Sequence, residues 1–134
     1  MSKGHVLVVE DNLDNYELVH TILEIAGYDT FLAVNGRDGV DAARKQKPDL
    51  ILMDMSLPEM DGWEATKLIR EDPETAKIPM IALTVHTLPL EMKRALDAGV
   101  NAYLPKPYDA GQLIRLIENT LKNAKPKRKK KQKG

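Results

Sequence analysis

The sequence contains no cysteine. The chain therefore has no thiol nucleophile, no thiolate metal ligand and no disulfide framework. Its three histidines, His5, His20 and His86, are too widely spread to predict a zinc site by their spacing. A metal site in this chain would have to depend on oxygen ligands.

Long hydrophobic runs are missing as well. The first apolar run, residues 6–9 (VLVV), breaks off at acidic residues, so it is too short for a signal-peptide core or a membrane span. We therefore expect a cytoplasmic protein. A length of 134 residues suits one domain that can fold without disulfides or a structural metal.

A net charge is also absent, because 20 Lys and Arg residues balance 20 Asp and Glu residues. Seven of those cations lie in residues 125–134 (KPKRKKKQKG), which leaves residues 1–124 with a net charge of −7. We predict a folded domain over 1–124 and a disordered basic tail over 125–134. The tail could bind nucleic acid or anionic lipid. The simpler interpretation is a tail that only improves solubility or that was added in cloning.

Short apolar segments alternate with segments of helical apolar spacing. Strands are predicted at 6–9, 28–34, 49–53, 78–84 and 101–105, and helices from Asp11 or Asn12 to Gly27 and at about 37–46, 63–71, 89–98 and 109–122. This alternation predicts an α/β fold: a doubly wound parallel sheet of five strands with helices on both faces. Ligands of such sheets bind at the carboxyl ends of the strands.

Polar residues lie at the carboxyl ends of four of the predicted strands: Glu10 and Asp11, then Asp54, Thr84 and Lys106. Carboxylates 4 Å apart would repel each other by roughly 4 kcal/mol per pair, so a cation must lie among them or one must be protonated. Oxygen ligands favour a hard ion, and we predict Mg²⁺, or Mn²⁺ in its place. Lys106 could instead neutralise the acids as an internal ion pair.

Asp54 ends an apolar run, and this position alone would equally suit a buried capping acid. Its neighbours favour a chemical role, because a lysine beside a metal and a threonine hydroxyl makes a good clamp for a phosphoryl group. The set fits phosphorylation of a carboxylate, in which Asp54 attacks phosphorus.

Residues 4–122 resemble the CheY-like receiver domains of bacterial response regulators. The resemblance is carried by four motifs in the family's order: VLVVEDN, PDLILMDMSLPEMDGWE, IPMIALT and AYLPKP. It implies a flavodoxin-like sheet with strand order 2-1-3-4-5. No output domain fits in the few residues after the fifth helix, so we expect a stand-alone receiver or one cut from a longer protein.

The resemblance also implies the roles of individual residues. Asp54 would be the phosphoacceptor, and Mg²⁺ would be bound by Asp11, Asp54 and the backbone carbonyl of Ser56, with Glu10 binding directly or through water. Thr84 and Lys106 would bind the phosphoryl oxygens.

A cis peptide bond before Pro107 and a switch role for Tyr103 are implied too. The donor would be a phosphohistidine of a sensor histidine kinase or a histidine phosphotransfer domain. The receiver would catalyse only its own phosphorylation and dephosphorylation. It would signal through its fourth and fifth helices and fifth strand, about 87–122, to an unknown protein target, as a monomer or a phosphorylation-dependent dimer.

Three other functions fit the sequence less well. Haloacid dehalogenase-like phosphatases usually need a second aspartate two positions after the nucleophile, and Ser56 stands there. A phosphorylation-independent docking scaffold would typically lack the acceptor, the acid pair or the lysine, all of which are present. Nucleic-acid binding is opposed by the acidic body and by the lack of a basic recognition helix.

Some residues depart from the common pattern. Val85 is larger than the usual residue after the switch threonine, so we predict slower phosphoryl entry and hydrolysis than in Val85→Ala. His86 is expected to be solvent-exposed and without a role. Trp63 is expected to pack at the rim near the acceptor, and Pro105 indicates an edge strand. Gly39 should weaken its helix, with no evident functional need for it.

Overall fold

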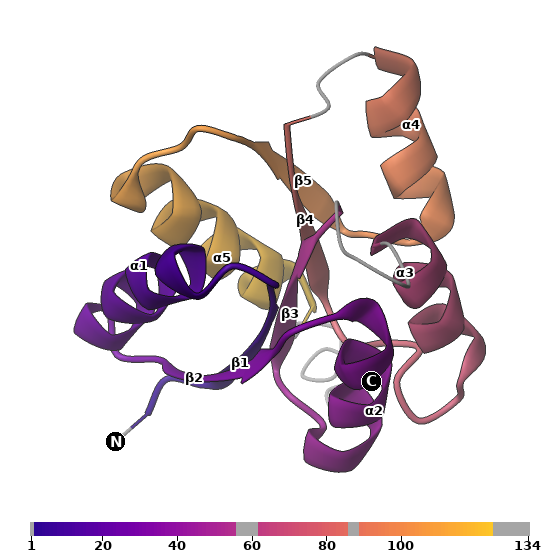
Figure 1. The fold of residues 1–134 in the computed structure, drawn as a ribbon, viewed down its shortest axis with the longest axis horizontal. Coiled ribbons are helices and arrows are strands. Elements are labelled where there is room, and N and C mark those ends of the chain that lie inside the picture. Colours follow the sequence, from indigo (N-terminus) through magenta and orange to yellow (C-terminus); the bar gives the residue numbers. More distant parts are fainter. Residues whose placement is uncertain (1, 56–61, 86–88, 125–134) are drawn as a thin grey trace, which may run out of the picture.

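The computed structural model describes residues 2–55, 62–85 and 89–124, in which five strands alternate with five helices (Figure 1). The strands are β1 (His5–Val9), β2 (Asp29–Ala33), β3 (Leu50–Asp54), β4 (Met80–Thr84) and β5 (Ala102–Pro105). The helices are α1 (Leu13–Ile25), α2 (Gly36–Gln46), α3 (Gly62–Glu71), α4 (Pro89–Ala98) and α5 (Ala110–Ala124).

The five strands form one parallel sheet in the order β2-β1-β3-β4-β5, which confirms the predicted topology. β5 lies at the edge next to β4, and its last residue, Pro105, is aligned with Thr84. An edge position tolerates the missing N–H of proline, so this part of the prediction is confirmed.

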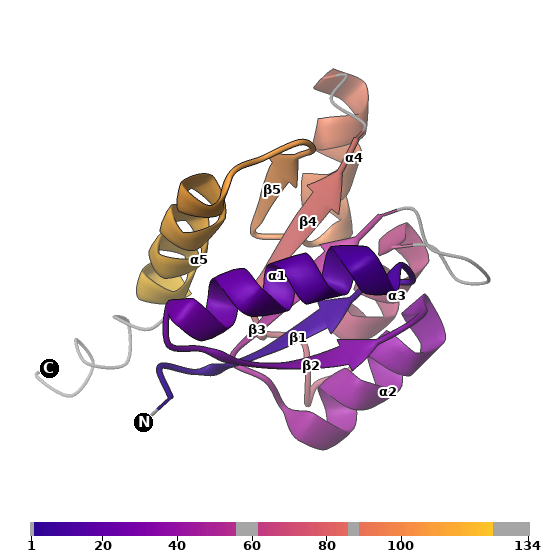
Figure 2. The same ribbon diagram turned by 60° about the vertical axis from the view of Figure 1, so that its left-hand side comes forward.

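The sheet is covered by helices on both faces (Figures 1 and 2). α1 and α5 pack on one face against a core that contains Val8, Leu52 and Leu83. α2 and α3 pack on the other face against Leu7 and Met53, and α4 lies on that side beside α3. β3 and β4 are buried along their whole length because helices cover both of their sides.

Element boundaries differ from the predictions by one or two residues. The side chain of Asn12, not that of Asp11, caps α1 by accepting a hydrogen bond from the Asn15 N–H at 2.9 Å. α1 ends before Gly27, whose φ of 102° suits a residue without a side chain. The predicted strand 78–84 is shorter because Ile78 closes a turn by donating its N–H to the Thr75 carbonyl.

Two glycines allow helices to approach the sheet closely. A Cβ on Gly39 would lie 2.9 Å from a methyl carbon of Val9 on β1, so this glycine is needed for packing, a reason that the sequence alone did not reveal. A Cβ on Gly62 would lie 2.7 Å from the Cα of Met55 and 2.8 Å from the Asp54 carbonyl oxygen. α3 therefore begins in direct contact with the backbone at the end of β3.

Candidate functional site

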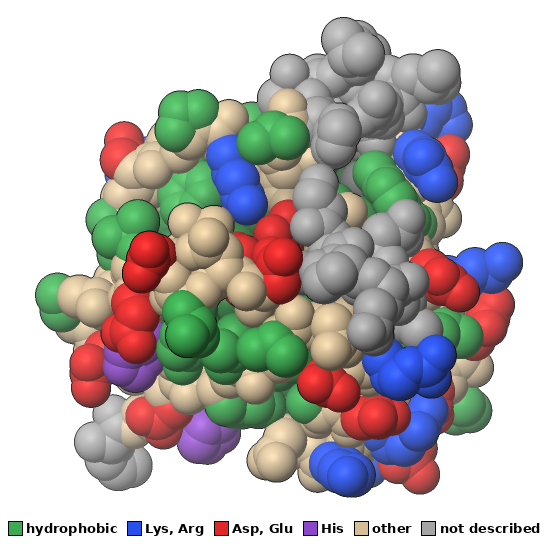
Figure 3. Space-filling model, in the orientation of Figure 1, with side chains coloured by type: hydrophobic (Ala, Val, Ile, Leu, Met, Phe, Trp, Pro, Cys, Tyr) green, Lys and Arg blue, Asp and Glu red, His purple; other side chains and the backbone are tan. Residues whose placement is uncertain are grey.

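Three carboxylates meet at the carboxyl ends of β1 and β3. Glu10, Asp11 and Asp54 each place one carboxylate oxygen within 4.8 Å of the others. Glu10 and Asp54 are buried, at 3% and 5% exposure, whereas Asp11 is exposed. Figure 3 shows acidic side chains beside a basic one on this side of the molecule. The structure thus brings together the three acids predicted from the sequence.

Backbone hydrogen bonds fix these residues at the strand ends. The Glu10 N–H donates to the Ala33 carbonyl on β2 at 2.9 Å. The Met55 N–H, directly after Asp54, donates to the Leu83 carbonyl on β4 at 3.1 Å. The site is therefore anchored to neighbouring strands on both sides of the β1–β3 pair.

The start of α1 organises the two N-terminal acids. Because Asn12 is the N-cap residue of the helix, the carboxylate of Asp11 is not used for capping. The Asn12 N–H also donates to Oε2 of Glu10 at 3.2 Å, and the nearby Asn15 side chain helps to lower the pKa of the same carboxylate. The polar residues of this turn thus orient the acid pair.

Burial and mutual repulsion make the charged form of Glu10 in this cluster less favourable. Burial raises the pKa of Glu10, and the nearby charge of Asp54 raises it further, whereas the Asn12 N–H and Lys106 oppose this shift. Lys106 places its Nζ 3.7 Å from Oδ2 of Asp54, so the internal ion pair that the sequence left open as an alternative is present. One ammonium does not balance three carboxylates, and a hard divalent cation suits this set of oxygen donors.

Lys106 reaches the acids from the end of β5. Its N–H donates to the carbonyl of Thr84 at 2.8 Å, which joins the ends of β4 and β5. The peptide bond between Lys106 and Pro107 is cis, in agreement with the expectation. The lysine and the threonine therefore border the same end of the sheet as the acid cluster.

Thr84 and Tyr103 share one face of the sheet. Thr84 is buried at the end of β4, and Tyr103 on β5 is half-buried against the core beneath α2 and α3. Tyr103 is aligned with Ala82, two residues before Thr84 on the adjacent strand. The two proposed switch residues are thus close neighbours.

Tyr108 is a residue near the site that the sequence reasoning missed. Burial raises the pKa of its hydroxyl, and the charges of Glu10 and Asp54 raise it further. It borders a cavity of about 250 Å³ beside the acids, lined by Glu10, Asn15, Leu18, Lys106, Pro107 and Tyr108. The only signal in the sequence was an aromatic residue directly after Lys106 and Pro107.

Some predicted features lie outside the described residues or at their limit. Ser56, whose carbonyl was expected to bind the metal, His86 and the basic tail are outside the described ranges. Val85 is described and is 61% exposed at the rim. Trp63 is half-buried against the core, as the packing interpretation predicted.

A doubly wound parallel sheet with a cluster of acids and a lysine at its carboxyl edge defines a class of α/β domain whose ligand site lies at the carboxyl ends of the strands. The family model of the response regulator receiver domain matches residues 6–118. The chain belongs to this family of two-component signalling domains. Such domains have a regulatory role and are not catalytic enzymes, and they interact with histidine kinases and downstream targets.

Relatives support this assignment over nearly the whole chain. The polar-differentiation response regulator DivK of Brucella anthropi is 40% identical over 119 residues, which cover 89% of this chain and 97% of DivK. DivK of Brucella ovis is 39% identical with the same coverage.

Solved structures agree with these relatives. A sensor histidine kinase receiver domain from Pseudomonas aeruginosa, with a magnesium ion in its active-site cleft, has a TM-score of 0.82 and 36% identity. The match covers 88% of this chain and 97% of that one. The chemotaxis protein CheY4 of Vibrio cholerae has a TM-score of 0.83 and 28% identity, covering 90% and 98%.

The helices of the described part of the chain do not have the properties of a membrane span. None of them combines the length and the apolar character needed to cross a bilayer.

Proposed function

We propose that this chain is a signalling switch that accepts a phosphoryl group on Asp54. The observation that carries the proposal is the cluster of Glu10, Asp11 and Asp54 within 4.8 Å, with the Lys106 ammonium 3.7 Å from Asp54. A buried carboxylate that pairs with an ammonium and lies beside two further acids suits metal-assisted phosphoryl transfer better than a purely structural role.

The chemistry assigned to Asp54 is nucleophilic. A carboxylate oxygen of Asp54 attacks the phosphorus of a phosphohistidine, and the bond between phosphorus and the imidazole nitrogen breaks as the electron pair leaves with the imidazole. Water later attacks the acyl phosphate, which returns the carboxylate and releases inorganic phosphate. A histidine kinase or a histidine phosphotransfer domain is the proposed donor.

Glu10, Asp11 and Asp54 are the proposed metal ligands, with Glu10 binding directly or through water and the Ser56 carbonyl as a further ligand. When bound there, Mg²⁺ would neutralise charge on the transferring phosphoryl group, and Mn²⁺ could replace it. The acid cluster supports this assignment, and the magnesium ion in the Pseudomonas aeruginosa receiver is a parallel in a relative.

Lys106 and Thr84 are the proposed ligands of the phosphoryl oxygens. The Lys106 ammonium already lies beside Asp54, and the hydroxyl of Thr84 is a donor on the neighbouring strand end. A phosphorylated side chain brings about −1.5 to −2 charge at neutral pH, which draws both groups toward it. The added charge at Asp54 would then cause the side chains of Lys106 and Thr84 to move toward it.

The output is proposed to leave through α4, β5 and α5. A shift of Thr84 opens space for Tyr103, because both lie on the same face of adjacent strands. The altered surface would bind a downstream protein, with the chain acting as a monomer or as a phosphorylation-dependent dimer. Cytoplasmic location and disorder of the basic tail stay predictions.

Intact mass after incubation with acetyl phosphate tests the proposal directly. The wild type, Asp54→Asn and Asp97→Asn are incubated with and without Mg²⁺. Asp97 is a matched control, since it is an exposed aspartate on α4 that pairs with Lys93 at 3.0 Å. We expect one phosphoryl group in the wild type and in Asp97→Asn, only with Mg²⁺, and none in Asp54→Asn.

A chain that takes up no phosphoryl group from acetyl phosphate or from a histidine kinase would contradict this function. The phosphorylation-independent docking scaffold would then be the better description.

A further inference from the structure

α3 contacts the acceptor strand at its first turn. The first residue of the helix, Gly62, has no space for a side chain because the Cα of Met55 and the carbonyl oxygen of Asp54 occupy it. Backbone meets backbone at this point, without a flexible side chain between them. A displacement at the end of β3 is therefore passed directly to α3.

The last turn of α3 carries a guanidinium that bonds to three residues in two other segments, the loop after α3 and the turn between α4 and β5. Arg70 donates from Nε to the Gly99 carbonyl at 2.8 Å, from Nη1 to the Ala76 carbonyl at 3.0 Å, and from Nη2 to Oδ1 of Asn101 at 3.0 Å. These acceptors are two carbonyls and one amide, and burial lowers the pKa of the guanidinium. The rigid fork of arginine thus serves as a geometric clamp.

The clamp fixes the turn between α4 and β5. Gly99 has a φ of 119°, and a Cβ there would lie 2.6 Å from Cγ of Arg70. Asn101 uses the same Oδ1 to accept the Met80 N–H at 2.8 Å, so the start of β4 belongs to this network. Arg70 on α3 is therefore bonded directly to the α4–β5 turn and is connected to the start of β4 through Asn101.

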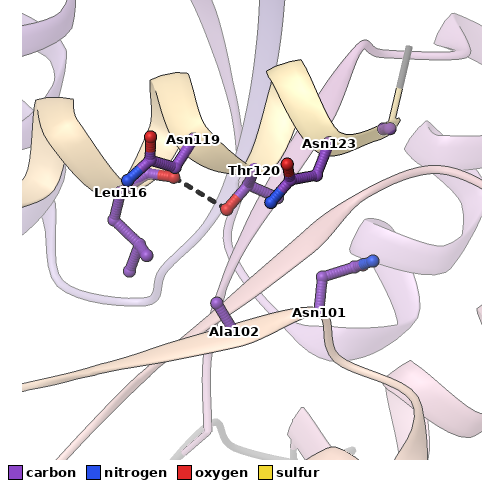
Figure 4. A pocket seen from close by; sticks show the side chains of 7 residues that line it. Asn101, Ala102, Leu116, Asn119, Thr120 and Asn123 are labelled. Atoms are coloured by element: carbon purple, nitrogen blue, oxygen red, sulfur yellow. Dashed lines mark hydrogen bonds between the residues drawn. The ribbon is translucent and has the colours of Figure 1, made fainter. Parts of the chain in front are cut away.

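The clamp also reaches the surface proposed for output. Asn101 borders a groove of about 290 Å³ between β5 and α5, together with Asn119 and Thr120 (Figure 4). Toward the other end of α3, the guanidinium carbon of Arg94 on α4 lies 4.6 Å from the centre of the Trp63 ring. The first turn of α3 thus contacts the middle of α4, and its last turn contacts the turn that follows α4.

We propose that Arg70 is a positioning residue that couples α3, and through it the acceptor end of β3, to the α4–β5 turn and the groove bordered by Asn101. This inference rests on the proposed function, since it assigns a second route from Asp54 to the output surface. The first route runs through Thr84 and Tyr103. The second is built from backbone packing at Gly62 and hydrogen bonds at Arg70.

Hydrogen exchange of the full chain, measured by mass spectrometry, tests this coupling. Amide exchange in 99–104 is compared with and without Mg²⁺ and excess acetyl phosphate, at an occupancy confirmed by intact mass. The variants are Arg70→Gln and the control Arg44→Gln, which removes an arginine of α2 that bonds Asp72 at 2.8 Å. Arg70→Lys is a third variant that keeps the charge but not the fork.

We expect phosphorylation to change exchange rates in 99–104 by about fivefold or more in the wild type and Arg44→Gln. Arg70→Gln should take up the phosphoryl group equally well but lose most of that change, and Arg70→Lys should be intermediate. Trp63 fluorescence reports the contact with Arg94. Its change on phosphorylation should be largest in the wild type and Arg44→Gln, intermediate in Arg70→Lys and smallest in Arg70→Gln.

A merely structural role of Arg70 predicts a different result. Amide exchange in 99–104 would then rise equally in the phosphorylated and the unphosphorylated protein. The ratio of the two exchange rates in Arg70→Gln would equal that of the wild type, and the inference would be overturned. If Arg70→Gln does not fold, the ratio of exchange rates with and without phosphorylation in Arg70→Lys tests the inference in its place. A wild type that takes up no phosphoryl group would overturn the proposed function, and this inference with it.

Discussion

Val85 is the residue whose size should tune the speed of the switch. It follows the buried Thr84 directly and is 61% exposed at the rim of the site. A branched side chain there restricts the space through which a phosphodonor or a hydrolytic water reaches Asp54. We expect Val85→Ala to speed both phosphorylation by acetyl phosphate and loss of the phosphoryl group severalfold, measured by intact mass against time. Faster turnover in the wild type than in Val85→Ala would contradict this prediction.

The acid cluster was largely predictable from single residues and their order. Glu10, Asp11 and Asp54 follow strands of a parallel sheet, so topology alone brings them to one edge. The choice of Asn12 as the cap of α1 was not predictable, because Asp11 and Asn12 are both good caps. Folding decided between them, and the result leaves Asp11 beside the other acids. Tyr108 was missed because its burial depends on the path of the chain after Pro107.

Among the elements, the packing of α2 on β1 should depend on Gly39. Replacement by alanine improves helix propensity by roughly 0.5 to 1 kcal/mol, but the new methyl meets the buried Val9. Overpacking of this kind costs about 1 to 3 kcal/mol, so we expect a net loss of stability on urea unfolding.

Gly111→Ala is the matched control for Gly39→Ala. Gly111 lies in the first turn of α5, where an added Cβ would have as its nearest neighbours the end of the flexible Arg115 side chain at 3.2 Å and Oδ1 of Asp109 at 3.3 Å. This variant should be neutral or slightly stabilised. Equal effects of the two substitutions would show that propensity, rather than packing on Val9, decides the outcome.

Asp72 should make the loop after α3 sensitive to acid. Its pKa is lowered by the hydrogen bond from the Glu74 N–H and then by Arg44 of α2. The stabilisation is therefore present above the ordinary aspartate pKa and is lost as pH falls through the lowered value. We expect Asp72→Asn to be less stable than the wild type near pH 7, with a difference that shrinks below about pH 3.9.

Glu74→Gln is the control for Asp72→Asn. Glu74 and Lys47 pair at 3.0 Å, but both side chains are well exposed, so the pair should contribute little at any pH. Thermal unfolding of the three proteins across pH measures both effects. A difference for Asp72→Asn that grows on acidification would contradict the expected loss of the Asp72 contribution at low pH.

In the molecule as a whole, charge is divided between an acidic body and a basic tail. Residues 1–124 carry a net charge of −7, and residues 125–134 carry seven cations. We expect a chain that ends at Ala124 to unfold within about 0.5 kcal/mol of the full chain and to accept a phosphoryl group equally well. Urea unfolding and intact mass measure the two properties. A clear loss of either would show that the domain extends into the tail.

The order of residues along the chain was enough to predict the alternation of strands and helices, the edge at which the acids meet, and the placing of Thr84 and Lys106 at strand ends on the same edge. These features follow from apolar periodicity and from the rule that parallel strands point the same way. Such information is local, or depends only on the order of elements along the chain.

Close contacts between distant segments, in contrast, were set by the packing of the folded chain. The need for Gly39 and Gly62, the burial of Tyr108 and the three bonds of Arg70 all arise between segments that are far apart in sequence. Packing density and the available space determine such contacts, and no pattern of residue types along one segment records them.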